Sequence, residues 1–461
     1  MSRICDGRVH LIGIGGTGLS AIARVLAERG CEVSGSDRTE SPRTEALRRL
    51  GVRVSIGHDA AAVEGASMVV RSSAVPLSNP EVQAALAAGI PVLTRREFLP
   101  LLTEGYRVIA VAGSHGKTTT TAMLAWALSA LGADPTYIVG AEVRALGANA
   151  HSGKSPWFVI EADEYDHMFW GLSPYAAVVT NIEHDHPDMF PTAEDFFAAF
   201  RGFAERITPD GFLLACADDA GSLRLAEEHS RSGGRAFTYG LQSDGAHYQA
   251  VALRTNAAGG YDFTFVAPRG ATAEVSLAIP GKHNVQNAVA ALGVLHLLGM
   301  DVSGAAAALA KFTGAGRRFE VRGEVKGVLF VDDYGHHPTE IRATLAAARD
   351  RYPKRKIWAV WQPHTYSRTL ALLGEFAEAF HDADAVVVTP VFAARETPPD
   401  GFEARRVAAA IRHPRVRFAP SLRAAADLLV NEVEPPAVVL VFSAGDAPLV
   451  NRLAMEGWER K

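Results

Sequence analysis

The sequence predicts an α/β protein of three domains, and three observations support that prediction. Two glycine-rich stretches, HLIGIGGTGLS and AVAGSHGKTTTTAML, each lie between a strand-like run and a helical pattern. Short apolar runs alternate with helical patterns along most of the chain, which is typical of parallel sheets covered by helices. At 461 residues the chain is also too long for one ordinary core.

We expect a Rossmann-like domain over residues 1–103. The runs RVHLIGI, CEVSGS and VRVSIG are predicted to be strands, and LSAIARVLAERG is predicted to be a helix. Strand, helix and strand in that order indicate a parallel sheet with helices on its faces.

Two further α/β domains are expected. The central one, 104–315, opens with RVIAVAG and the helical TTTTAMLAWALSALG, and continues through WFVIEAD and AAVVTNI. Between 245 and 280, alternating runs separated by glycine-containing turns predict an antiparallel excursion, after which NVQNAVAALGVLHLLG returns to helix. A Rossmann-like C-terminal domain, 316–461, contains the strand-like runs VLFVDDY, KIWAVWQP, AVVVTP and AVVLVFSAG.

Composition narrows the class of protein. With 48% apolar and 21% charged residues and a formal net charge of -5, the chain is predicted to be globular and not a general nucleic-acid binder. Cys5, Cys31 and Cys216 suggest neither a disulfide framework nor a zinc site. No apolar run approaches the ~18 residues of a membrane span. We therefore expect a cytoplasmic protein, monomeric or homodimeric, without membrane insertion.

The first glycine loop has the full context of a dinucleotide-binding turn. Gly13, Gly15 and Gly18 follow a strand and open a helix, and Asp37 lies about 20 residues further on, where an acid can bind a ribose hydroxyl. This chemistry specifies a pyrophosphate and a sugar, so either a nicotinamide dinucleotide or a UDP-sugar would fit. A turn that only packs the helix on the sheet is the structural alternative.

The second loop resembles an abbreviated phosphate-binding loop. The usual G-x-x-x-x-G-K-[ST] pattern would need glycine at position 111, where the chain has Val111. Lys117 can still meet a triphosphate, and the Thr118 hydroxyl can reach Mg²⁺. EADE and NIEHDHPD each follow a predicted strand, so Glu161 and His186 are expected near the loop as candidate metal ligands, or else belong to a solvated acidic cluster.

Seven motifs together resemble the Mur ligase family of peptidoglycan synthesis. They are GSHGKTTTT, EADEYD, TNIEHDHPD, GKHNVQNA, GRRFE, DDYGHHPTEI and QPHTYSRT, in that order along all three predicted domains. The resemblance implies that the short central loop binds ATP and that the N-terminal loop holds the UDP of a sugar substrate. DDYGHHPTE and QPHTYSRT are the most specific pair, and imply UDP-N-acetylmuramate and L-alanine as substrates, joined through an acyl phosphate.

The same resemblance implies roles for individual residues. For ATP they are Gly113, Ser114, His115, Gly116, Lys117, Thr118, Thr119, His283, Asn284, Asn287, Arg318 and Asp333. For the UDP-sugar they are Gly13, Gly15, Gly16, Gly18, Asp37, His58, Ser72 and Ser73. Tyr334, His336, His364 and Arg368 would shape the amino-acid site. Thr118, Glu161 and His186 would hold Mg²⁺, and Lys117, Arg318, His336 and Arg368 would act in catalysis.

Several of these residues have structural alternatives. Asn284 and Asn287 are placed to cap a helix, and His336 and His337 precede the helix that Pro338 opens. Arg317 and Arg318 could form a surface pair, and His58, Ser72 and Ser73 could serve ordinary loops. Arg318 can reach the central loop only if the C-terminal domain closes on it, so we expect closure on ligand binding.

Three alternatives concern function. EADEYD is similar to the family member that recycles murein tripeptide, whereas QPHTYSRT disfavours that enzyme. An NAD-dependent dehydrogenase would leave the second loop unexplained, and a non-catalytic ATP-gated protein would not need the full residue set.

Some Mur ligases carry a carbamoylated lysine about fifteen residues past the D-H motif, where this chain has Arg201. We therefore expect no carbamate.

Overall fold

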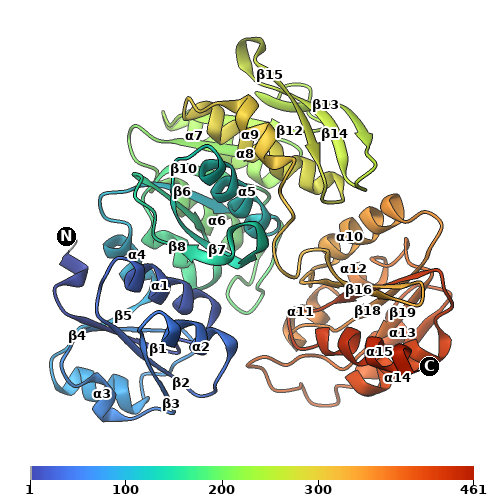
Figure 1. Cartoon of the computed structure of the whole chain (residues 1–461), viewed down its shortest axis with the longest axis horizontal. Coiled ribbons are helices and arrows are strands. Elements are labelled where there is room, and N and C mark those ends of the chain that lie inside the picture. The colour runs from blue at the N-terminus through green and yellow to red at the C-terminus, as the bar shows by residue number, and fades with distance from the viewer. Residues whose placement is uncertain (1–2, 461) are drawn as a thin grey trace.

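The computed structural model describes residues 3–460 and forms three sheets in chain order (Figure 1). Each predicted domain contains one of the three sheets, and the three-domain α/β prediction is confirmed. Among the described residues no helix is both long and apolar enough to cross a membrane.

The N-terminal sheet has five parallel strands in the order β3-β2-β1-β4-β5. Its strands are β1 (Arg8–Ile12), β2 (Val33–Asp37), β3 (Arg53–Ile56), β4 (Ala66–Arg71) and β5 (Val92–Thr94), and its helices are α1 (Thr17–Glu28), α2 (Pro42–Arg49), α3 (Pro80–Ala87) and α4 (Arg95–Leu102). Helix α1 buries Leu19, Ile22, Ala23 and Leu26, the i, i+3, i+4, i+7 face of a helix packed on a sheet. The predicted strands and helix are confirmed here.

The central sheet has ten strands in the order β15-β14-β13-β12-β11-β10-β6-β9-β7-β8. The strands are β6 (Arg107–Ala112), β7 (Thr136–Val143), β8 (Ala148–His151), β9 (Trp157–Glu161), β10 (Pro174–Val179), β11 (Phe212–Cys216), β12 (Ala236–Gly240), β13 (Tyr248–Thr255), β14 (Tyr261–Val266) and β15 (Thr272–Leu277). The helices are α5 (Lys117–Ala130), α6 (Ala193–Ala204), α7 (Ala220–Arg231), α8 (Lys282–Leu297) and α9 (Val302–Leu309). Strands β13, β14 and β15 pair antiparallel, which confirms the predicted excursion.

The C-terminal sheet has the order β16-β17-β21-β18-β19-β20 and is parallel except for its edge strand β16. The strands are β16 (Glu320–Val325), β17 (Val328–Asp333), β18 (Lys356–Trp361), β19 (Ala385–Val388), β20 (Val416–Phe418) and β21 (Ala437–Phe442). The helices are α10 (Pro338–Arg351), α11 (Tyr366–Ala371), α12 (Leu373–Ala377), α13 (Ala404–Ala410), α14 (Leu422–Glu432) and α15 (Pro448–Arg460). All six residues of β17 and of β21 are buried, as expected for parallel strands covered on both faces.

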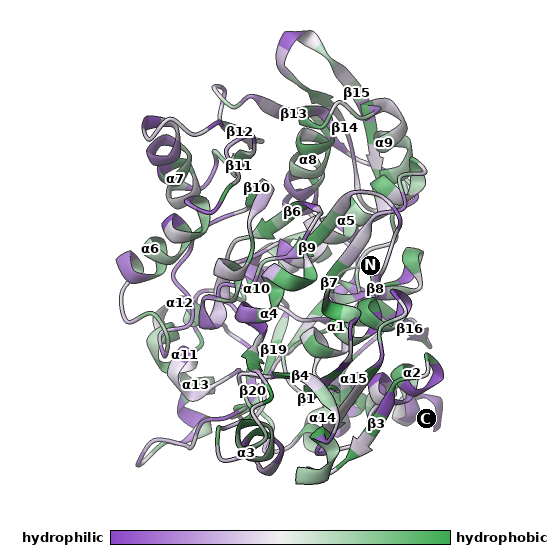
Figure 2. Ribbon diagram, turned by 90° about the vertical axis from the view of Figure 1, so that its left-hand side faces the viewer, coloured by the Kyte–Doolittle hydropathy of each residue, from purple (hydrophilic) through white to green (hydrophobic). Residues whose placement is uncertain are grey.

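The three domains are not joined in the same way. Phe98 and Leu102 of α4 belong to one apolar cluster with Phe158 of β9 and Phe200 of α6, so the first two domains share a core. The C-terminal domain has two apolar clusters of its own, one on each side of its sheet. In Figure 2, hydrophobic residues predominate on an inner helix such as α8, whereas the outer helix α7 is largely hydrophilic. We infer that the C-terminal domain is the one able to move as a body.

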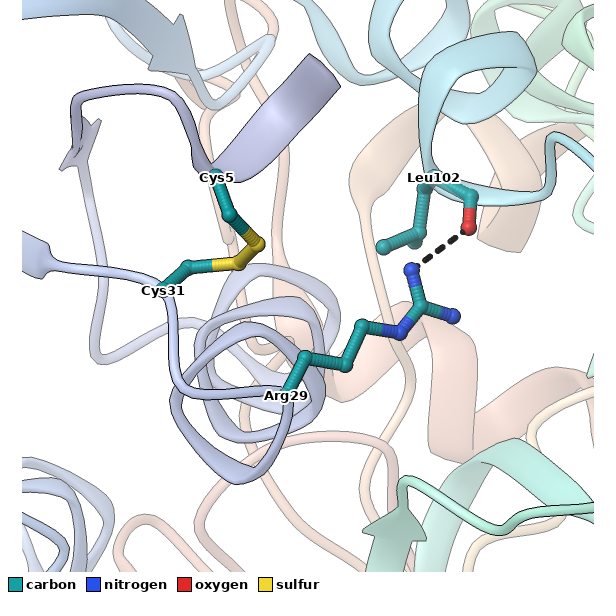
Figure 3. Close-up of a disulfide and its surroundings, with 4 residues drawn as sticks. All are labelled: Cys5, Arg29, Cys31 and Leu102. Carbon is teal, nitrogen blue, oxygen red and sulfur yellow. Dashed lines mark hydrogen bonds between the residues drawn. A yellow bond between two sulfur atoms is a disulfide. The ribbon is translucent and has the colours of Figure 1, made fainter. Parts of the chain in front are cut away.

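One sequence-based expectation is wrong. Cys5 and Cys31 form a disulfide, with their Cα atoms 4.6 Å apart (Figure 3). The pair forms because Cys5 precedes β1 and Cys31 precedes the adjacent parallel strand β2, a juxtaposition that a separation of 26 residues does not reveal. Next to this pair Arg29 donates a hydrogen bond to the Leu102 carbonyl at 2.9 Å. Cys216 is free and buried.

Candidate active site

The second glycine loop forms a tight turn between β6 and α5. Gly113 and Gly116 have φ of 135° and 81°, a region that favours glycine. A side chain would also be obstructed, because a Cβ on Gly116 would lie 2.7 Å from Asn287 Oδ1 and one on Gly113 would overlap the Thr180 hydroxyl. The short loop is therefore closely packed, and its amides open helix α5, where an anion is favoured.

Lys117 lies at the start of that helix and is held by its surroundings. Its Nζ donates to the carbonyls of Gly113 and, at 3.2 Å, of Ser114, and it lies 2.9 Å from the buried Glu164 carboxylate. Burial alone would lower the pKa of Lys117, but Glu164 and the neighbouring acids raise it overall. A fixed cation thus lies where a bound triphosphate would place negative charge.

A hydroxyl and a carboxylate meet beside the loop. Thr118 Oγ1 donates to Glu161 Oε1 at 3.0 Å, and the Gly140 amide donates to Glu161 Oε2 at 2.7 Å. Burial raises the pKa of Glu161 despite the nearby cations Lys117 and Arg318. A buried carboxylate beside a hydroxyl is the oxygen donor set that Mg²⁺ prefers, so the residues fit that ion.

His186 lies in the segment that follows strand β10 and has a backbone φ of 55°. Its Nε2 lies 3.4 Å from the Glu164 carboxylate, and its Nδ1 lies 3.3 Å from Arg368. Burial would lower the pKa of His186, but Asp185 and Glu164 raise it overall. In this structure the imidazole is therefore part of an ion network, and its predicted role as a metal ligand stays a prediction.

The C-terminal domain contributes a cluster of basic and aromatic groups. Arg368 is almost fully buried, and its Nε donates to Asp185 Oδ1 at 2.7 Å across the boundary with the central domain. Its Nη1 lies 3.1 Å from His364 Nδ1, and the rings of His364 and His336 are 5.7 Å apart. Burial, followed by the Arg368 charge, lowers the pKa of His364 to about 4 and that of His336 well below its usual value. Both imidazoles are neutral at pH 7.

One cavity of about 430 Å³ brings these groups together. From the predicted residues it is lined by Gly13, Gly16, Gly18, Ser72, Ser73, Ser114, His115, Gly116, Lys117, Thr118, Glu161, His186, Arg318, Tyr334, His336, His364 and Arg368. All three domains therefore face the same space, and each glycine loop reaches it from its own sheet.

A second cavity of about 180 Å³ lies behind the phosphate loop, between the central and C-terminal domains. Of the predicted ATP residues it is lined by His115, Gly116, Thr119, His283, Asn284, Asn287, Arg318 and Asp333. Asn284 donates to the Pro280 carbonyl at 2.6 Å and receives a bond from Asn287 at 3.2 Å, so the two amides form one unit. The Asp333 carboxylate accepts the amides of Phe319 and Gly335, and burial raises its pKa to about 6.

Three predicted UDP-sugar residues lie outside the lining of the first cavity. The Asp37 carboxylate accepts the Gly15 amide at 2.8 Å, so it supports the glycine loop itself. His58 contacts Ser36 at 3.1 Å and lies 3.5 Å from Glu81, within a polar network of the N-terminal domain. A direct ligand contact for these residues stays a prediction.

Sequence reasoning also missed residues that line the first cavity. The charged and aromatic ones among them are Arg95, Asp163, Glu164, Tyr165, Asp185, Glu340 and Arg395. Arg95 comes directly after the short strand β5, at the sheet edge where the first glycine loop lies, and this position was an available signal. Glu340 carried no such signal, because a glutamate in the first turn of a helix is ordinary.

Arg201 stands where some Mur ligases carry the carbamoylated lysine, and it lies outside the lining of this cavity. It lies on α6, where it pairs with Glu228 at 3.0 Å. We predict that turnover is unchanged when CO₂ is stripped from the buffer and when bicarbonate is added back. Slower turnover in the stripped buffer that bicarbonate restores would contradict this prediction.

The buried neutral histidines predict a pH dependence of stability. Burial lowers the pKa of His283 and of His364 to about 4, whereas an unfolded histidine titrates near 6.5. Their contribution to folding is therefore complete above pH 6.5 and is lost as the pH falls from 6.5 towards 4. We expect the urea midpoint to fall over this range, and to fall less in His364→Gln. An equal fall in both proteins would contradict the assignment.

The site has the features of an enzyme of phosphoryl transfer. They are two nucleotide-type loops, a fixed lysine, a hydroxyl–carboxylate pair and an arginine from a third domain. The chain belongs to the Mur ligase family: residues 8–107 match the model "Mur ligase family, catalytic domain", 111–295 the "Mur ligase middle domain" and 317–445 the "Mur ligase, glutamate ligase domain". This membership removes the dehydrogenase interpretation of the first loop.

Individual relatives are similar over nearly their whole length. The UDP-N-acetylmuramate–L-alanine ligase of Kineococcus radiotolerans is 46% identical, covering 96% of this chain and 94% of the relative. The ligase of the same name from Rubrobacter xylanophilus is also 46% identical, covering 95% and 97%. The solved UDP-N-acetylmuramate–alanine ligase of Thermotoga maritima aligns with a TM-score of 0.82 at 28% identity, covering 98% and 99%. A murein peptide ligase from Psychrobacter arcticus shares the fold, with a TM-score of 0.73 at 24% identity, covering 99% of each chain.

Proposed function

We propose that this chain is an ATP-dependent ligase that joins L-alanine to the lactyl carboxylate of UDP-N-acetylmuramate, in the synthesis of peptidoglycan precursors. The observation that carries the proposal is the single cavity in which both glycine loops meet the Tyr334, His336, His364 and Arg368 cluster. Near-full-length relatives with this printed name, at 43–46% identity, support the choice of substrates. We assign the domains to residues 1–103, 104–315 and 316–461, and the reaction to the cytoplasm.

The chemistry requires activation of a carboxylate, which is a poor electrophile. The lactyl carboxylate attacks the γ-phosphate, and the products are an acyl phosphate and ADP. The neutral amine of L-alanine then attacks the acyl carbon, and phosphate leaves from the tetrahedral intermediate and takes up the amine proton as hydrogen phosphate. Each step conserves charge and atoms, and the protein contributes mainly positioning and neutralisation of phosphate charge.

The residues divide this work by domain. Lys117 and the amides that open α5 hold the phosphates, and Arg318 approaches the γ-phosphate from the C-terminal domain. Mg²⁺, held by Thr118 and Glu161 with His186 as a further donor, would neutralise charge on the β- and γ-phosphates. His336, His364 and Arg368 shape the amino-acid site, and the neutral imidazoles leave Arg368 as the cation for the alanine carboxylate.

Phosphate release tests the proposal directly. The assay contains ATP, UDP-N-acetylmuramate and, in parallel wells, L-alanine, glycine, L-serine or murein tripeptide. We expect the fastest release with L-alanine. Release only with tripeptide would instead support the recycling ligase, for which Tyr165 of EADEYD, a cavity-lining residue, is the structural argument. No release with any amine would contradict the ligase proposal.

A further inference from the structure

A cluster of polar side chains joins the phosphate loop to the C-terminal domain. His115 of the loop and Glu183, which follows β10, come from the central domain; Thr339 and Glu340 come from the first turn of α10. His115 Nε2 lies 3.0 Å from Glu183 and its Nδ1 lies 3.4 Å from Glu340. Thr339 Oγ1 donates to Glu183 at 2.7 Å. Two of these three contacts, His115–Glu340 and Thr339–Glu183, therefore connect the two domains at one place, and His115 makes two of the three.

The charges in this cluster favour a protonated His115. Burial alone would lower the pKa of His115, but hydrogen bonds to Glu183 and Glu340 raise it to about 9. The same contacts outweigh burial at the acids, lowering the pKa of Glu183 to about 2 and that of Glu340 well below its usual value. One cation therefore lies between two carboxylates that would otherwise repel each other across the domain boundary.

His115 is also fixed in the phosphate loop through its backbone. Its amide donates to Asn181 Oδ1 at 2.8 Å, and its carbonyl accepts the Thr180 hydroxyl at 2.5 Å. On the other side, Glu340 accepts the His336 amide at 2.9 Å and lies 3.4 Å from Arg318 Nη1. His115 therefore belongs to the phosphate loop, and its imidazole contacts the carboxylate of Glu340, which in turn contacts the two proposed catalytic residues Arg318 and His336.

We propose that His115 is a positioning residue: it connects Glu183 to Glu340, and so holds Arg318 and His336 over the phosphate loop when the C-terminal domain is closed. This rests on the proposed function in so far as Arg318 and His336 act in it. Closure of the site is then tied to the loop that binds the nucleotide, because the same residue belongs to both. The carboxylate of Glu183 would have no cationic partner in this cluster without His115, since burial lowers the pKa of His337 to about 4 and leaves it neutral.

A divalent cation is the competing occupant of this position. Ligand atoms of His115, Glu183 and His337 lie within 4.8 Å of one another, a grouping that could hold a metal ion. Both ring nitrogens of His115 already face carboxylates, so a metal would have to displace a proton from a strongly basic imidazole. The geometry therefore favours the imidazolium.

The test compares His115→Gln with His151→Gln. His151 is a matched control, because it also lies between two carboxylates, Glu28 at 3.0 Å and Asp134 at 3.1 Å, but its side chain is 41% exposed and does not line the cavity. Small-angle scattering is recorded with and without a non-hydrolysable ATP analogue plus UDP-N-acetylmuramate, and the KM for L-alanine is measured separately from kcat. We expect His115→Gln to keep the open radius of gyration with ligands present and to lose about 100-fold in kcat/KM for L-alanine.

The double variant His115→Gln/Glu183→Gln separates positioning from simple loss of fold. Removing the carboxylate relieves the repulsion left by the first change, so we expect the double variant to recover part of the closure and of the alanine KM. Normal closure and an unchanged alanine KM in His115→Gln would overturn the proposal. So would one equivalent of bound zinc in the purified protein that is absent from His337→Gln. If the wild-type protein releases no phosphate with L-alanine, the proposed function fails, while the scattering comparison still tests the link.

Discussion

Replacing Lys117 with methionine is expected to reduce ligase turnover by about 1,000-fold or more. The lysine begins α5, and its Nζ is held by two loop carbonyls and by Glu164, so the charge is already in place before a triphosphate binds. Methionine keeps most of the length of the side chain and removes the charge. Phosphate release at saturating L-alanine measures the loss, and Lys311→Met, at an exposed lysine of the same domain, provides the control.

The same substitution has an expected cost in stability that must be separated from catalysis. Glu164 is buried, and among the residues that the structure describes its carboxylate keeps, without Lys117, only the longer 3.4 Å contact with His186. Removing one partner of a buried ion pair costs about 3–5 kcal/mol. We therefore expect Lys117→Met to unfold at a lower temperature, and Lys117→Met/Glu164→Gln to regain most of that stability while staying inactive. An active double variant would show that the lysine serves the fold and not the phosphates.

Much of the fold could be predicted because its signals are local. A strand, a glycine loop and a helix follow one another within about 25 residues at Gly13 and again at Gly116. The antiparallel strands β13–β15 could be predicted because apolar and polar residues alternate along them and glycine-containing turns separate them. The buried parallel strands instead have continuous apolar runs. Edge strands such as β8 and β20 were missed, because short, half-buried runs have no distinctive pattern.

Part of the candidate site also followed from topology. The carboxyl ends of parallel strands share one edge of a sheet, and Glu161 and His186 do line the same cavity as Lys117. Their roles as ligands stay predictions. The pairs Arg368–Asp185 and His115–Glu340 could not be inferred, because each joins residues about 180 or more positions apart from different domains. Such contacts depend on how two domains meet, and a single sequence does not encode that in any local pattern.

Arg318→Ala is the second substitution with a large expected effect. Arg318 lies 3.4 Å from Glu340 and 5.1 Å from the Tyr334 ring centroid, and it lines both the first cavity and the cavity behind the phosphate loop. A guanidinium aimed at developing phosphate charge acts mainly in the transition state. We therefore expect kcat to fall by about 100- to 1,000-fold while the Kd for ATP changes much less.

Two further variants define what the guanidinium contributes. Arg318→Lys keeps the charge but loses the planar fork, so we expect only partial activity. Arg412→Ala, at a 77% exposed arginine of the same domain, should match the wild type. The decisive measurement is exchange of ¹⁸O between the bridging and non-bridging positions of ATP, with UDP-N-acetylmuramate present and L-alanine absent, because it reports acyl phosphate formation alone. If Arg318 stabilises the γ-phosphate, its removal slows this exchange as much as turnover. Normal exchange with slow turnover would place Arg318 in the second half of the reaction, at the attack of the amine.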